Sequence, residues 1–163
     1  MSSVGNILAR FVTDRIYAEG GWAGSFLVEV DGVKIGHFRE ISGLSVDIGV
    51  EEVEEGGQNG FVHKLPGRMT WPNLVLKKGI TASNALFDWI NKVSGDGFTG
   101  QRNKVTRSTM AVILVGADGT TRLRSWNFEG AFPVKWSGPS FAVGSTDPAD
   151  EELEIAHHGF TVS

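Results

Sequence analysis

The sequence predicts a mostly β protein in which two packed antiparallel sheets form a β-barrel or sandwich, with one flanking α-helix and a long projecting β-hairpin arm. Three observations support this. Several short segments alternate apolar and polar residues, tight-turn dipeptides separate some of these segments, and only one segment repeats apolar residues with a helical period. The 22 glycines are spread between the apolar runs, as expected for many short strands joined by turns.

The first predicted hairpin joins a strand over Ser25–Val30 to a return strand over Val33–Ile41. Asp31-Gly32 lies between them, and both of its positions tolerate the positive φ of a two-residue hairpin turn.

The hairpin arm is predicted over residues 44–65. In Leu44–Val50 the apolar residues Leu44, Val46, Ile48 and Val50 share one face of a strand. The alternation then fails at Glu51, Glu52, Glu54 and Glu55, so either a bulge shifts the register or the strand leaves the core. Phe61 and His63 bring the chain back, and Pro66-Gly67 is interpreted as the corner that ends the arm. We expect its polar, glycine-rich tip to be exposed.

The predicted helix covers residues 83–93. Its apolar residues recur at i, i+3, i+4 and i+7, which gives one stripe for packing on the sheets or on another subunit: Leu86, Trp89, Ile90 and Val93. Ser83 can cap its start, and Gly95 stands just past its end. Before it, Leu74–Leu76 is a short strand, and Lys77 and Lys78 are interpreted as surface charges.

The second half predicts further strands. Met110–Val115 is apolar on both faces and therefore a buried strand, and Asp118-Gly119 is a second hairpin signal. Arg122–Glu129 returns, and Phe132–Trp136 continues as a short strand or bend, broken by Pro133 and Pro139. Glu151–Phe160 closes the fold, with Glu152 and Glu154 opposite Leu153 and Ile155.

Composition narrows the possible functions. At 163 residues with 40% hydrophobic and 21% charged residues, the chain has the size and balance of one soluble domain, residues 1–163, whose segment 1–22 shows no clean period. The net charge of -4 disfavours general nucleic-acid binding. The chain has no cysteine, no apolar run long enough to span a bilayer and no secretory signal at its start. We expect synthesis in the cytoplasm and no direct membrane insertion.

No motif for catalysis, cofactor binding or metal binding is apparent. His157 and His158 are adjacent, so on a strand they point to opposite faces, and His37 and His63 lie on other strands without a carboxylate at a recognisable spacing. The histidines are therefore interpreted as solvated or interface residues. The glutamates at 51, 52, 54 and 55 lack the order of a calcium loop. We expect no enzyme activity, no cofactor and no metal.

Three segments together resemble one family: Lys64–Ile80, Phe132–Pro139 and Glu151–Phe160. The family is the inner tail-tube protein of contractile phage tails and phage-tail-like contractile injection systems, a structural relative of the type VI secretion tube protein. The matches run in order along residues 24–160 and include Ser25–Val30, Ile41–Leu44 and the helix.

The resemblance implies that six subunits close into a ring and that rings stack into a hollow tube. The hairpin arm is then the candidate for the contact between rings, through Val46, Ile48, Val50, Glu51, Glu52, Glu54, Glu55, Phe61 and His63. The resemblance implies as partners the contractile sheath, the baseplate and spike, tube-capping proteins, and a tape-measure protein, DNA or effector protein in the lumen. The particle would be a virion or an assembled injection particle. Two other classes stay open: a monomeric β-barrel module that binds a ligand or carbohydrate, and, more remotely, a hydrolase that uses His157 or His63.

Overall fold

A computed structural model describes residues 24–57, 60–80, 83–94, 105–139, 144 and 149–163. It contains one described helix, α2 (Ala85–Val93), and ten strands: β1 (Ser25–Val30), β2 (Val33–Phe38), β3 (Glu40–Ser42), β4 (Asp47–Val53), β5 (His63–Thr70), β6 (Leu74–Gly79), β7 (Ser108–Val115), β8 (Arg122–Ser137), β9 (Asp150–Ala156) and β10 (Phe160–Val162). The predicted segment 1–22 and Gly95 lie outside the described residues.

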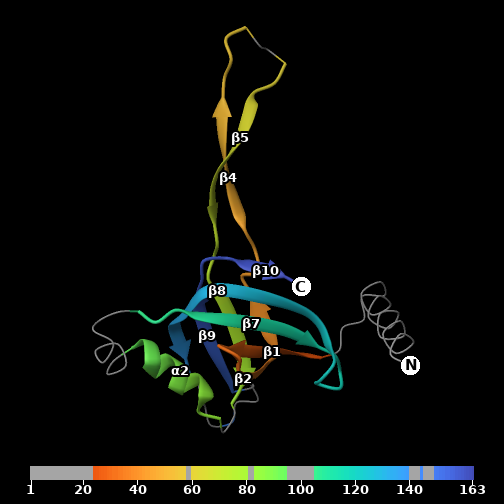
Figure 1. The fold of residues 1–163 in the computed structure, drawn as a ribbon, viewed down its shortest axis with the longest axis vertical. Coiled ribbons are helices and arrows are strands. Elements are labelled where there is room, and N and C mark those ends of the chain that lie inside the picture. Colours follow the sequence, from red (N-terminus) through yellow and green to blue (C-terminus); the bar gives the residue numbers. More distant parts are fainter. Residues whose placement is uncertain (1–23, 58–59, 81–82, 95–104, 140–143, 145–148) are drawn as a thin grey trace, which may run out of the picture.

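The body is built from two antiparallel sheets that share β8. The strands follow the order β2-β1-β7-β8-β9-β6-β3, and β10 also pairs with β8. The first part of β8 pairs with β7 and the second part pairs with β9, so this one strand passes from one sheet to the other (Figure 1). Only Arg39 separates β2 from β3, and its N–H donates to the Lys77 carbonyl. The predicted two-sheet fold is confirmed.

The core lies between the two sheets and under α2. Val28, Met110 and Phe128 come from one sheet, Leu76 and Leu153 come from the other, and all five are at most 2% exposed. The alternation predicted for the closing strand is confirmed, because its apolar residues face this core. β7 is buried on both faces, as its continuous apolar run predicts, since a second buried cluster forms on its other side.

The predicted Asp31-Gly32 turn is present. Asp31 has φ 49° and Gly32 has φ 79°, and β1 pairs with β2 on either side. The Asp31 side chain also accepts hydrogen bonds from the N–H and hydroxyl of Thr109, at 2.9 and 3.2 Å. The turn therefore ties the first hairpin to the start of β7.

Two predicted strand boundaries are wrong. Arg122–Glu129 and Phe132–Trp136 form one continuous strand, because Gly130 takes a φ of 62° and Pro133 lies beyond the segment that pairs with β7. Glu151–Phe160 is not one strand, since residues between Ala156 and Phe160 leave the ladder and Gly159 has a φ of 126°. Proline has no N–H to donate, so it is found in strands only where the ladder makes no hydrogen bond to that residue. A positive φ is adopted most easily by glycine.

Lys78 is not the surface charge that the sequence suggested. Its side chain is 3% exposed, with Nζ 3.6 Å from Glu151 and 5.6 Å from the centre of the Phe38 ring. Lys77, its neighbour, is partly exposed and pairs with Glu40 at 3.0 Å. Alternation along β6 turns one lysine toward the interior and the next toward solvent.

The buried position of Lys78 leads to a stability prediction. Lys78→Met should lower the free energy of unfolding by about 2 kcal/mol, because it leaves the mostly buried Glu151 carboxylate without this counter-charge. Adding Glu151→Gln should restore much of the loss. Lys77→Met is the matched control and should have little effect. Urea denaturation of the four proteins tests this, and equal losses for Lys78→Met and Lys77→Met would contradict it.

Candidate assembly surfaces

The hairpin arm is the most exposed part of the described chain. β4 and β5 pair only with each other, and the ribbon they form projects from one end of the body (Figure 1). Every residue of β4 is exposed, as is every residue of β5 except Gly67. An isolated two-stranded ribbon is at best marginally stable in water, so this arm has the character of a segment that acquires partners on assembly.

The arm is longer than the sequence suggested. β5 continues through Pro66-Gly67 to Thr70, and Pro66 pairs with Val50, so the dipeptide is not the corner that ends the arm. A two-stranded ribbon has two outer edges, where a proline costs no ladder hydrogen bond. The register shifts between Ile48 and Val50, before the point where the alternation fails, and every residue of β4 is exposed. The strand therefore leaves the core, which was the second possibility given by the broken alternation.

The apolar side chains of the arm face solvent. The predicted residues Val46, Ile48, Val50 and Phe61 are 41–60% exposed, whereas Leu44, the first residue of the alternation, packs on the core. The sequence analysis missed four more exposed apolar residues of the arm: Val53, Val62, Leu65 and Met69. For Met69 the missing signal was the length of β5, because ending the arm at Pro66 separated Met69 from its partner Ile48. The other three lie within the predicted arm but outside its Leu44–Val50 alternation.

The register assigns these residues to both faces of the ribbon. Ile48 lies opposite Met69, and Val50 lies opposite Pro66. Leu65 lies opposite Glu51, one position further along, and therefore on the other face. Apolar groups on both faces mean that one flat contact on one side would leave part of the arm in water. Exposed apolar patches of this kind mark interaction sites.

The predicted acidic residues lie toward the tip and are exposed. Glu52 pairs with Lys64 at 3.8 Å, and Glu55 lies 3.5 Å from His63, whose ring stacks edge-on against Phe61 at 5.0 Å. Glu51 and Glu54 are also solvated. Exposed ion pairs contribute little to stability, so these contacts leave the charges free to meet a partner.

His157 anchors the root of the arm, and it is buried rather than solvated or at a free surface. Its Nε2 donates to the Pro72 carbonyl at 3.1 Å, and its Nδ1 accepts from the Gly159 N–H at 3.1 Å. Trp71 stacks on Phe160 at 5.1 Å and closes over Gly159, where a Cβ would lie 3.0 Å from the indole. Both ring nitrogens are satisfied only in the neutral Nε2–H form.

This geometry predicts acid sensitivity. Burial lowers the pKa of His157 below its usual 6.5, although the hydrogen bond to the Pro72 carbonyl acts in the other direction. The unfolded chain therefore takes up a proton before the folded chain does. Stability should fall as the pH drops below about 6.5, and the loss should level off below the lowered pKa of the folded state.

The measurement is the free energy of unfolding between pH 8 and pH 4.5. His157→Gln should flatten this curve. His37→Gln is the comparison, because burial and Lys34 also lower the pKa of His37. An unchanged slope in the His157 variant would contradict the assignment.

The helix places its stripe as predicted. Leu86 and Trp89 are 1% and 4% exposed, while Ile90 and Val93 are partly buried and pack against the core. The helix starts two residues later than expected, and Ser83 gives only a long contact of 3.4 Å to the Ala85 N–H. Its C-terminus is closed by the Ser94 hydroxyl, which donates to the Ile90 carbonyl at 2.9 Å.

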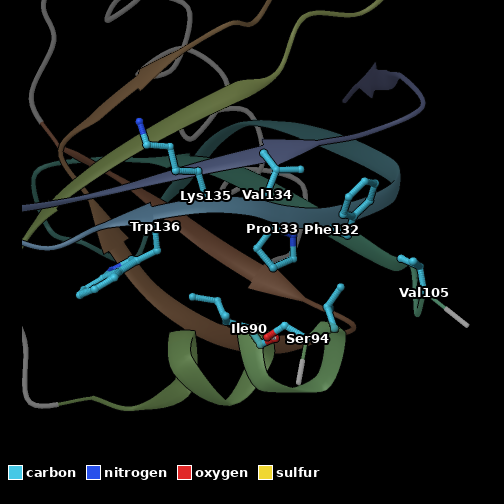
Figure 2. A pocket seen from close by; sticks show the side chains of 9 residues that line it. Ile90, Ser94, Val105, Phe132, Pro133, Val134, Lys135 and Trp136 are labelled. Atoms are coloured by element: carbon cyan, nitrogen blue, oxygen red, sulfur yellow. Dashed lines mark hydrogen bonds between the residues drawn. The ribbon is translucent and has the colours of Figure 1, made fainter. Parts of the chain in front are cut away.

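A groove of about 400 Å³ runs between α2 and the second part of β8 (Figure 2). Ile90, Val93 and Ser94 line it from the helix side, and Val105 lies at one end. Phe132–Trp136 form the other wall, and Figure 2 shows Pro133 and Trp136 on the side of β8 that faces α2. Lys135 is the charged residue of the lining, which is otherwise apolar apart from Ser94.

Among the described residues, no three histidine or acidic side chains come together in a way that could hold a metal ion. Within the same residues, no helix has the length and apolar character needed to cross a membrane.

Comparisons with known proteins agree on one family. The model of the family described as T4-like virus tail tube protein gp19 matches residues 22–161. A search of curated proteins gave no match. Among solved structures, a chain of the sheath-tube complex of the extracellular contractile injection system PVC is 30% identical, with a TM-score of 0.68 over 85% of this chain and 87% of that chain.

Two further structures give the same picture. A chain from the sheath/tube terminator of PVC is 31% identical, with a TM-score of 0.68 over 85% of this chain and 92% of that one. A chain from the tube-terminating cap of the anti-feeding prophage is 29% identical, with a TM-score of 0.67 over 85% and 87%. A type six secretion system protein, 13% identical with a TM-score of 0.54 over 85% and 82%, shares the fold. The chain belongs to the gp19 tail tube protein family and is a tail tube protein of the kind found in contractile injection systems.

Proposed function

We propose that copies of this chain close into hexameric rings and that the rings stack into a hollow tube held inside a contractile sheath. The family match over residues 22–161 supports a tube subunit, and one solved relative at 21% identity comes from a baseplate with 6-fold symmetry. The observation that carries the assembly is the arm, because its apolar side chains are solvated in a single subunit. Burial of such surface is the usual driving force for association.

The stack follows from two different contacts. A head-to-tail contact that closes under rotation gives a ring, and a second heterologous contact along the axis propagates rings into a tube. The arm projects along the long axis of the subunit, which suits the second contact (Figure 1). We assign the predicted arm residues, together with Val53, Val62, Leu65 and Met69, to contacts between rings.

The tube acts mechanically. Contraction of the sheath drives it out, and DNA or an effector protein passes through its lumen. Its partners are the sheath, the baseplate and spike, a tube-capping protein and a tape-measure protein or cargo. The solved relatives come from a sheath-tube complex, a tube terminator and a baseplate. No catalytic residue, cofactor or metal is needed for this role.

Negative-stain microscopy and sedimentation of the purified chain test the proposal. We expect rings that convert to tubes as protein concentration rises, since assembly follows mass action. A chain that stays monomeric at high concentration across a range of salt would overturn the proposal and favour a ligand-binding β module.

A further inference from the structure

One wall of the α2–β8 groove contains a strand edge that pairs with no described strand. β7 pairs with β8 only as far as Ala131, opposite Ser108. From Phe132 to Ser137 the other edge of β8 pairs with β9, and no described strand pairs with the edge on the β7 side. A strand edge with unpaired N–H and carbonyl groups can accept another strand. Here that edge borders an apolar groove.

Side chains around the groove are exposed although they are large and apolar. Val105, Val134 and Trp136 are 41%, 45% and 36% exposed, and Phe87 on α2 stacks on Trp136 while remaining 39% exposed. The groove therefore offers an apolar surface next to a strand edge that pairs with no described strand. That combination suits an extended chain that carries apolar side chains.

The arm carries the complementary features. Each of its strands has one outer edge without a partner strand, and its apolar side chains lie on both faces. When an outer strand is added to a sheet edge, one face can enter the groove beside α2 while the other covers the opposite side of β8. A strand added at β8 therefore needs apolar side chains on both of its faces, and the arm has them.

Charge favours the same pairing. The arm between residues 47 and 70 carries five carboxylates, whereas its only lysine and arginine are Lys64 and Arg68. Lys135 extends from β8 on the side away from α2 (Figure 2), and Arg107 stacks on Phe132 at 4.9 Å. The acidic arm and these basic side chains of β8 and its neighbour attract each other, which sets orientation and speeds association.

The two surfaces lie toward opposite ends of the subunit. The arm leaves the body beside β10, and α2 lies toward the other end (Figure 1). An arm cannot bend back to its own groove without crossing the body. Two different surfaces at opposite ends generate an open, repeating contact between copies.

We propose that the arm of one subunit docks in the α2–β8 groove of a second copy in the adjoining ring, adding a strand at the β7-side edge of Phe132–Ser137. The inference rests on the proposed tube assembly and names the acceptor surface for the arm. The occupant is a second copy of this chain, while a ligand or another protein is an alternative that the experiment separates.

Cysteine cross-linking tests this directly, because the chain has no cysteine of its own. Single variants at the arm, Val50→Cys or Leu65→Cys, are mixed with Ser94→Cys at the groove, with a mass tag on one partner. Val162→Cys in β10 is the matched control, since it is 46% exposed but lies at the arm end of the body. Mild oxidation is followed by electrophoresis without reductant, and the same samples are imaged.

We expect at least one arm variant to form a mixed disulfide with Ser94→Cys at least ten-fold more than with Val162→Cys. Tubes without that cross-link, or with equal cross-linking to Val162→Cys, would overturn the groove as the acceptor and leave the tube intact. If the unmodified chain forms neither rings nor tubes, the proposed function fails, and this inference fails with it.

Discussion

Replacing residues 52–64 with Asn-Gly should leave a folded subunit that forms no long tubes. The replacement removes the outer arm and joins Glu51 to Leu65, which already lie opposite each other in the ladder, through a dipeptide suited to a two-residue hairpin turn. The described arm residues beyond the register shift are exposed, apart from Gly67, and none of them belongs to the core cluster or to the apolar residues that pack against it. Their loss should therefore reduce inter-ring contact rather than folding.

Circular dichroism, sedimentation and negative-stain microscopy of the shortened chain measure this. We expect a native spectrum, species no larger than short stacks, and tube length reduced at least ten-fold. Glu52→Gln with Lys64→Gln is the matched control, because it removes one exposed ion pair and keeps the apolar surface, so long tubes should persist. Failure of the shortened chain to fold, or tubes of normal length, would show that the arm has another role.

Trp89→Ala should lower the free energy of unfolding by ~3–5 kcal/mol, because it removes a large buried side chain between α2 and the sheets. Trp89 is 4% exposed and belongs to the main core cluster. Its indole Nε1 has no hydrogen-bond partner in the described part of the chain. The contribution of Trp89 is therefore packing and not a polar contact.

Two variants on the same helix sharpen this test. Phe87→Ala also truncates an aromatic residue, but Phe87 is 39% exposed, so roughly 1 kcal/mol is expected. Trp89→Phe keeps most of the apolar contact and removes the unpartnered N–H, so it should cost clearly less than Trp89→Ala. Urea unfolding at one protein concentration measures all three. Equal losses for Trp89→Ala and Phe87→Ala would show that the stripe is not core.

Much of the fold follows from local patterns. The helical stripe of Leu86 and Trp89, the Asp31-Gly32 turn and the alternation of Leu153 and Ile155 each depend on residues close together in the chain. The tertiary structure is compatible with these local patterns and does not create them. The resemblance to tail-tube proteins also rests on ordered segments, and the family comparison confirms it over residues 22–161.

The candidate surfaces were harder to predict. The acidic tip and the apolar residues through Val50 mark an arm, but the arm's second strand was cut short at Pro66-Gly67. A proline interrupts a strand only where the residue must donate its N–H to a neighbouring strand. At the outer edge of a two-stranded ribbon no such hydrogen bond is made. The α2–β8 groove could not be predicted, because it depends on where β7 stops beside β8.

The sequence alone thus determined the strand-rich class, the helix, the tight turns and the presence of a polar-tipped arm, since each is encoded by neighbouring residues. Only the tertiary structure decided which charged and titratable groups are buried. Lys78 meets Glu151 because β6 pairs with β9, and His157 meets Pro72 because the closing segment passes the root of the arm. Burial of a charged or titratable group depends on partners distant in sequence, and no local pattern carries that information.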